Sequence, residues 1–176
     1  MTATVLILPG LGNSGPDHWQ SLWEKANPAF VRVQQRDWEH PVCEEWRQVL
    51  ERSVARAGAD AVLVAHSLAC LLVAHWAAGT SLKARGALLV APPNPDSPGF
   101  PGEAVGFSPL PVKLLPFPSI VVASSNDPYA GLDFASSSAV AWGSRFVSIG
   151  AAGHINAKSG LGEWQEGLSL LRHLAA

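Results

Sequence analysis

The sequence has little charge, few cysteines and no long apolar run. Only 15% of its residues are charged, and twelve Lys and Arg against fourteen Asp and Glu give a net charge of −2. A surface without excess positive charge is poorly suited to a phosphate backbone, so we expect no nucleic-acid partner. No apolar run approaches the ~20 residues that cross a bilayer, and no cationic segment precedes the first apolar stretch. Neither a membrane span nor a secretion signal is predicted.

Cysteine is nearly absent as well. Cys43 and Cys70 are the only two, too few for a disulfide framework or for a zinc site with four cysteine ligands. No cluster of His, Asp and Glu has metal-ligand spacing either, so we expect no metal and no other cofactor. A pair of scattered cysteines is typical of a reducing compartment, which favours a cytoplasmic location.

The hydrophobic content suffices for one core. With 176 residues, 48% of them hydrophobic, we expect a single domain over residues 1–176. Short apolar runs rich in β-branched residues predict six buried strands, at Val5–Leu8, Phe30–Val33, Ala61–Ala65, Ala87–Val90, Ile120–Ala123 and Phe146–Ile149. Helical spacing between them relates Trp19, Leu22, Trp23 and Ala26, then Trp46, Val49, Leu50 and Val54, and finally Trp164, Leu168 and Leu171. This alternation predicts an α/β fold, a mostly parallel sheet with helices on both faces.

Residues 92–118 break the alternation. They hold most of the fourteen prolines, which remove backbone donors and exclude a regular helix. We therefore expect an extended excursion between the fourth and fifth strands. It either connects the strands or also forms one wall of a substrate site.

A candidate nucleophile follows the third strand. The segment Ala65-His66-Ser67-Leu68-Ala69 leads into an apolar helix, so Ser67 sits between a strand and a helix with small residues on either side. This matches a relaxed form of the G-x-S-x-G turn that exposes a nucleophilic serine. A serine that merely caps the helix would give the same pattern, so the segment needs partners elsewhere.

Two loops supply those partners. Asp127 follows the fifth strand and His154 follows the sixth, on a glycine-rich turn. In a parallel sheet both loops lie at the carboxyl ends of the strands, where ligands bind. A serine needs a general base, and the base needs a carboxylate to orient it. The order Ser67, Asp127, His154 is that of an α/β-hydrolase, and it predicts a catalytic triad.

The loop after the first strand is expected to complete the site. The backbone N–H of Leu68 and that of Leu11, with Gly12 as the second choice, are the expected donors to a developing oxyanion. Gly10 and Gly12 allow close approach of a substrate, and His18 and Trp19 are candidates for lining its pocket. The alternative for this last pair is a place in the first turn of a helix capped by Asp17.

The same loop also matches the dinucleotide motif G-x-G-x-x-G at Gly10, Gly12 and Gly15. Asp37 or Arg36 could then meet the ribose. Pro16 counts against this reading, because it would fall in the first turns of the helix that the motif requires. The reading also leaves Ser67, Asp127 and His154 without a function.

Taken together, these motifs resemble a family of small serine hydrolases in the α/β-hydrolase superfamily, typified by a retinoblastoma-binding protein and its bacterial relatives. The matching segments are Leu8-Pro9-Gly10-Leu11-Gly12, Asp17-His18-Trp19-Gln20, the turn around Ser67, Ala91-Pro92-Pro93, Leu115-Pro116-Phe117-Pro118, Ser125-Asn126-Asp127-Pro128-Tyr129, Gly153-His154-Ile155-Asn156 and Ser159-Gly160-Leu161-Gly162-Glu163-Trp164. The resemblance implies an α/β-hydrolase fold without a separate lid domain. It also implies Ser67 as nucleophile, Asp127 as acid and His154 as base.

Two departures from the family are visible. Ala65 replaces a frequent glycine, and Leu68-Ala69-Cys70-Leu71-Leu72 lacks the glutamate of the retinoblastoma-binding motif, so that partner is not expected. We expect hydrolysis of a small ester or amide with a compact acyl group. The alternative from another class is a non-catalytic interaction module on the same scaffold.

Overall fold

A computed structural model describes residues 3–175 of the chain. Its centre is one parallel sheet of six strands in the order β2-β1-β3-β4-β5-β6, as predicted. The strands are β1 (Val5–Leu8), β2 (Phe30–Arg32), β3 (Val62–His66), β4 (Gly86–Val90), β5 (Ser119–Ala123) and β6 (Arg145–Ser148). The chain runs from β1 outward to β2 and then crosses to the other side of β1, so β1 and β3 are neighbours in the sheet.

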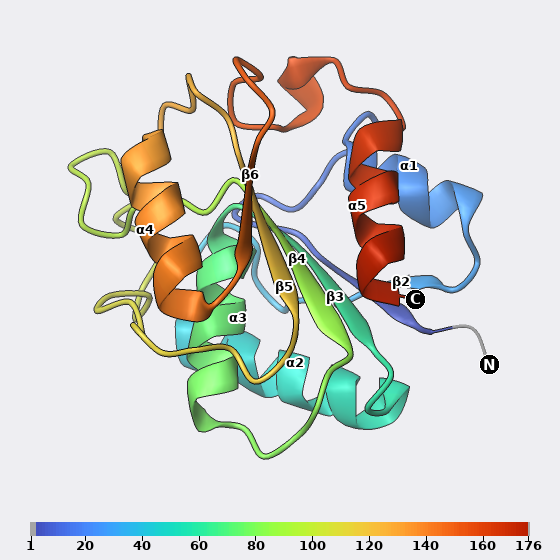
Figure 1. Cartoon of the computed structure of the whole chain (residues 1–176). Coiled ribbons are helices and arrows are strands. Elements are labelled where there is room, and N and C mark those ends of the chain that lie inside the picture. Colours follow the sequence, from blue (N-terminus) through green and yellow to red (C-terminus); the bar gives the residue numbers. More distant parts are fainter. Residues whose placement is uncertain (1–2, 176) are drawn as a thin grey trace.

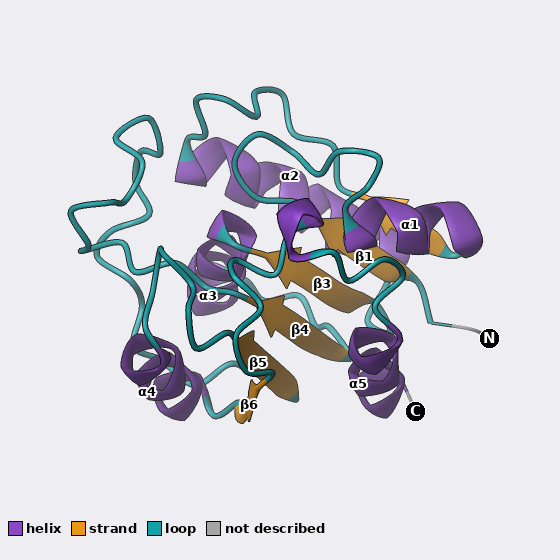
Figure 2. Cartoon of the chain, turned by 90° about the horizontal axis from the view of Figure 1, so that it is seen from above, coloured by secondary structure: helices purple, strands orange, loops and turns teal. Residues whose placement is uncertain are grey.

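Helices cover both faces of the sheet (Figure 1). They are α1 (Trp19–Ala26), α2 (Cys43–Ala57), α3 (Leu68–Gly79), α4 (Leu132–Trp142) and α5 (Gln165–Ala175), with a short 3-10 turn η1 (Ala157–Ser159). Helices α1 and α5 lie on one face, and α2, α3 and α4 lie on the other (Figure 2). Within residues 3–175 none of them is long and apolar enough to cross a membrane.

Each face has its own core, because successive strand residues point to opposite sides. In β1, Leu6 and Leu8 pack beneath α2 and α3, whereas Val5 and Ile7 pack beneath α1 and α5. Helix α3 is buried nearly all round, with only its last turns reaching solvent. A helix so enclosed gives the turn that precedes it little freedom to move.

The structure differs from the sequence prediction in details of the helices. Helix α4 had not been singled out, because its serines and alanines dilute the apolar spacing. Trp164 lies just before α5, with a φ of +40°, and not on the helical face shared by Leu168 and Leu171. Its indole covers Gly167, where an added Cβ would come within 2.2 Å of the ring. The strand boundaries agree with the prediction to within one residue.

The proline-rich segment contains no helix or strand between residues 91 and 118. A single bridge between Val42 and Val105 and the hydrogen bond from the Cys43 N–H to the Val105 carbonyl, at 2.9 Å, join it to the start of α2. Phe107 is fully buried in the core beside Trp46. The excursion is therefore packed against the domain, and it passes over the carboxyl ends of the strands.

Candidate active site

Ser67 stands on a strained turn between β3 and α3. Its φ of 56° and ψ of −126° are unusual for a residue with a side chain. The side chain does not cap the helix, so the capping explanation of this serine does not hold. Ala65 and Ala69 on either side are fully buried, which leaves Ser67 as the exposed point of the turn.

The loop after β1 lies directly against this turn. A Cβ added at Gly10 would be 3.0 Å from the Ser67 Cβ, 3.0 Å from the His66 carbonyl oxygen and 3.2 Å from the Leu68 nitrogen. Those distances are closer than ordinary packing allows. Only glycine at position 10 therefore lets the first loop approach the serine so closely.

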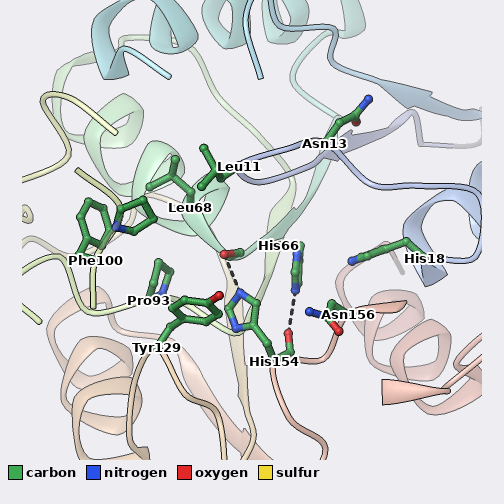
Figure 3. A pocket seen from close by; sticks show the side chains of 12 residues that line it. Leu11, Asn13, His18, His66, Leu68, Pro93, Phe100, Tyr129, His154 and Asn156 are labelled. Atoms are coloured by element: carbon green, nitrogen blue, oxygen red, sulfur yellow. Dashed lines mark hydrogen bonds between the residues drawn. The ribbon is translucent and has the colours of Figure 1, made fainter. Parts of the chain in front are cut away.

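The three residues predicted as a triad form a hydrogen-bonded line. His154 Nδ1 lies 3.0 and 2.9 Å from the two carboxylate oxygens of Asp127. His154 Nε2 lies 2.8 Å from Ser67 Oγ, a contact drawn as a dashed line in Figure 3. A carboxylate only accepts, so Nδ1 carries the proton and Nε2 is free to accept from the serine hydroxyl. The Asp127 and His154 side chains are only 3% and 9% exposed, which keeps water from competing for these bonds.

A polar network holds the histidine loop in position. Buried Ser124 donates from its hydroxyl to Asn126 Oδ1 at 2.9 Å and accepts the Ala152 N–H at 2.9 Å. Asn126 Oδ1 also accepts the Gly153 N–H at 2.7 Å. The loop after β5 is thereby fastened to the residues immediately before His154. This network fixes both the carboxylate and the base at the same rim of the sheet.

Two aromatic rings flank the base. His66 Nε2 donates to the His154 carbonyl oxygen at 2.9 Å, which ties the turn at Ser67 to the histidine loop. Tyr129 packs edge-on against the His154 ring at a centroid distance of 4.5 Å, and its N–H donates to Asp127 Oδ1 at 2.9 Å. The rings of His66 and Tyr129 both contact the imidazole of His154, and these contacts restrict its rotation.

Two further histidines beside the site are kept uncharged. Burial lowers the pKa of His66 well below its usual value, and the charges of His18 and His154 act in the same direction. Burial also lowers the pKa of His18 to about 4, with help from Arg32 and His154. The rings of His18 and His66 meet edge to face at 4.7 Å. Near neutral pH both rings are neutral neighbours of His154.

A pocket of about 210 Å³ opens over Ser67. Its lining comes from five separate parts of the chain: Leu11, Asn13, His18, His66, Ser67, Leu68, Pro93, Phe100, Pro101, Tyr129, His154 and Asn156. Pro93, Phe100 and Pro101 belong to the proline-rich segment. That segment therefore does form a wall of the pocket, the second of the two alternatives left open by the sequence.

The expected oxyanion donors lie at this pocket. Leu68 and Leu11 both line it, and neither N–H donates to another protein group among residues 3–175. The Gly12 N–H instead donates to the Trp38 carbonyl oxygen at 2.9 Å. The Gly12 N–H is therefore not free to donate to a substrate, and Leu11 stays the candidate donor from the first loop.

The four residues expected to contact substrate divide into two groups. His18 lines the pocket, and Gly10 shapes it from beneath Ser67. Gly12 and Trp19 do not line it. Trp19 is 1% exposed in the core, where its indole N–H donates to the Ile155 carbonyl oxygen at 2.8 Å. Its position corrects the expectation of a pocket residue: His18, the N-cap of α1, reaches the pocket, whereas Trp19, the first residue of the helix, packs into the core.

The residues of the dinucleotide motif are engaged elsewhere. Helix α1 begins at Trp19, beyond Gly15, so it does not open within the glycines as the dinucleotide motif requires. Asp37 accepts the N–H groups of its own turn, and Arg36 pairs with Glu45 through two hydrogen bonds of 2.9 and 2.7 Å. None of these groups is available to a ribose.

Cysteine and metal chemistry find no support at this site. Cys70 is fully buried, and burial raises the pKa of its thiol well above the usual value. Burial likewise raises the pKa of Cys43 to about 12. Both cysteines are free. Within residues 3–175 no group of His, Cys, Asp and Glu side chains is arranged to hold a metal ion.

Comparison with known proteins places the chain among hydrolases. The model of the serine hydrolase family matches residues 5–173. A YdeN-like hydrolase from Pectobacterium atrosepticum SCRI1043 is 32% identical, with 98% of this chain and 90% of that chain covered at a TM-score of 0.85. No curated protein sequence matches the chain.

More distant structures share the fold. The ydeN gene product of B. subtilis is 18% identical over 97% of both chains, with a TM-score of 0.81. A thermophilic esterase from Thermogutta terrifontis is 17% identical, with 98% of this chain and 90% of that chain covered and a TM-score of 0.69. These neighbours identify the sheet and its helices as an α/β-hydrolase fold.

Proposed function

This chain belongs to the serine hydrolase family, and from that premise we propose that it cleaves a small carboxylic ester or amide through an acyl-enzyme on Ser67. One observation carries the proposal. Ser67 Oγ, the His154 ring and the Asp127 carboxylate are joined in sequence by hydrogen bonds of 2.8 to 3.0 Å. A serine hydroxyl gains nucleophilicity when a base can take its proton as it attacks, and this alignment supplies the base.

The proposed reaction follows from the protonation states. His154 Nε2 takes the Ser67 proton while Oγ attacks the carbonyl carbon, and Asp127 stabilises the imidazolium through Nδ1–H. The Leu68 and Leu11 N–H groups donate to the oxyanion of the tetrahedral intermediate. His154 then protonates the leaving alcohol or amine. A water molecule, deprotonated by His154 in turn, attacks the acyl-enzyme and releases the carboxylic acid.

The size of the pocket favours a compact substrate. Its volume of about 210 Å³ is below the ~300–1,000 Å³ of pockets that enclose drug-sized ligands. Phe100 and Pro101 line its apolar side. We therefore propose short acyl groups in preference to long lipid chains. A cytoplasmic location belongs to the same proposal, since both cysteines are free and a reducing compartment keeps them so.

Replacement of the nucleophile tests the proposal. Ser67→Ala is expected to lower kcat on a short 4-nitrophenyl ester by at least about 10,000-fold, because the oxyanion donors alone leave only a small residual rate. Ser125→Ala is the matched control, since this exposed serine contributes no side-chain bond to the network. A fluorophosphonate probe should label the wild type and Ser125→Ala but not Ser67→Ala. Full activity or labelling of Ser67→Ala would reject the assignment, and an unreactive Ser67 would favour the interaction module.

A further inference from the structure

His18 has one ring nitrogen with a fixed role and one without. It caps α1, and its Nδ1 accepts the Gln20 N–H at 3.1 Å. A nitrogen that accepts cannot carry the proton, so in the neutral ring the proton is on Nε2. The low pKa of His18, about 4, keeps the ring neutral in the physiological range. Nε2 is therefore a fixed N–H donor.

That donor has no partner among the residues that the structure describes. Nε2 of His18 is buried and makes no hydrogen bond to any of residues 3–175, although the whole residue is only 4% exposed. The ring lines the pocket and points from the start of α1 towards His66 and the triad (Figure 3). A buried unpaired N–H costs about 1–3 kcal/mol, so an acceptor on a bound molecule would recover that loss.

Asn156 presents a second donor on the same side. Its Oδ1 caps η1 by accepting the Lys158 N–H at 3.0 Å, which assigns the outer end of the amide to Nδ2. Nδ2 donates to no group among residues 3–175, and Asn156 lines the pocket. In Figure 3 its amide lies between His18 and the backbone of His154. Two N–H donors without a partner among residues 3–175 thus share one wall.

The opposite wall is different in character. Leu68, Pro93, Phe100 and Pro101 make it apolar. No Lys or Arg lines the pocket, and Arg32 behind His18 is already bonded to Glu24, Asn13, Ser14 and Ser21. The polar wall consequently offers uncharged donors without a cation. The substrate group that fits this wall is an uncharged acceptor, because a substrate carboxylate would find no counter-charge there.

We propose that the substrate carries a second, uncharged oxygen acceptor beside the scissile carbonyl, and that His18 Nε2–H and Asn156 Nδ2–H donate to it. This inference rests on the hydrolase function proposed above. It narrows the substrate class from plain alkyl esters or amides to those with an ether, ketone or amide oxygen close to the scissile bond. His18 and Asn156 are then specificity-determining residues, and the apolar wall takes the remaining part of the substrate.

Matched substrate pairs test this preference. For the acyl side the pair is 4-nitrophenyl methoxyacetate and 4-nitrophenyl butanoate, which differ by an oxygen in place of a methylene. For the leaving-group side it is 2-methoxyethyl butanoate and butyl butanoate, followed by acid release. The intrinsic reactivity of each member cancels when the ratio of kcat/KM within a pair is compared between wild type and variant.

His18→Asn removes the ring Nε2–H and keeps the cap, since asparagine is among the best N-cap residues and its amide is shorter than the imidazole. In at least one pair we expect the preference for the oxygenated member to fall by about threefold to tenfold, mostly through KM, as for loss of one neutral hydrogen bond. Asn156→Ser, which keeps the cap of η1, should lower the same ratio. Phe100→Ala is the control from the apolar wall, and it should change both members of a pair alike.

The competing explanation is that the Nε2–H of His18 is satisfied by the face of the His66 ring, which it meets edge-on. In that case His18→Asn would alter both members of each pair equally, and the proposal would be wrong. Failure of the proposed function has other signatures, namely a wild type that neither turns over these esters nor is labelled at Ser67, or full activity of Ser67→Ala. Where turnover is slow, protection of Ser67 from a fluorophosphonate by 2-methoxyethyl butanoate and by butyl butanoate gives the same comparison as affinities.

Discussion

The rim that carries the triad and the walls that surround it are held by different forces. Asp127 and His154 are fixed by hydrogen bonds between two loops, through Ser124 and Asn126. The apolar wall at Phe100 and Pro101 is held by packing of the proline-rich segment over the core. Hydrogen bonds are directional and tolerate little displacement of their atoms, whereas a substitution in a packed apolar wall changes the shape of the pocket by a small amount. We therefore expect changes at the rim to act on kcat and changes in the walls to act on substrate choice.

The largest effect should come from the carboxylate. Asp127→Asn preserves the shape of the side chain but presents an amide to His154 Nδ1, which favours the wrong tautomer of the ring. We expect kcat to fall by about 10,000-fold with little change in KM. Steady-state kinetics on a short 4-nitrophenyl ester measures this. A fall of less than tenfold would mean that the line of hydrogen bonds does not drive the reaction.

A smaller effect at the rim tests the network itself. Ser124→Ala removes the acceptor of the partly buried Ala152 N–H and the hydroxyl donor to Asn126 Oδ1, which weakens the link between the two loops. We expect kcat to fall by about tenfold, because small displacements of a base are costly, and the free energy of unfolding to fall by about 1–3 kcal/mol. Ser125→Ala next to it is exposed and serves as the matched control. If Ser124→Ala and Ser125→Ala have the same kcat and the same free energy of unfolding, the hydrogen-bond network does not position His154.

The sequence revealed the rim far better than the walls. Ser67, Asp127 and His154 each follow a buried apolar strand, and the strand pattern alone brings the three loops to one edge. Nothing local marks Phe100 as a pocket residue, because its position depends on how an irregular segment packs over distant elements. The role of Ser124 could not be predicted from the sequence either, since a serine after a strand is typical of any turn. The unpartnered nitrogen of His18 emerges only from a full account of hydrogen bonds in three dimensions.

The uncharged rings of His18 and His66 beside the pocket predict that the free energy of unfolding falls in acid. The pKa of His18 is about 4 in the folded chain, and that of His66 is also far below its usual value, so both bind protons more readily when unfolded. Stability should therefore fall as the pH drops below about 6.5, by up to about 1.4 kcal/mol per pH unit for each ring. Urea unfolding at pH 7, 6 and 5 measures the slope. His18→Asn should make it shallower, and an unchanged slope in that variant would contradict the assignment.

The smallest effect is expected at the apolar wall. Phe100→Ala enlarges the pocket on the side away from His18, and loss of part of the ring contact should cost a short acyl ester about 1 kcal/mol, or about fivefold in kcat/KM. Longer acyl groups should lose less or gain, because the space vacated by the ring accommodates them. A series of 4-nitrophenyl esters from acetate to octanoate would reveal this as a shift of the optimum towards longer chains. If kcat falls equally for every ester, Phe100 acts on the triad instead of on substrate choice. The rule that the rim sets the rate and the walls select the substrate would then not apply to this residue.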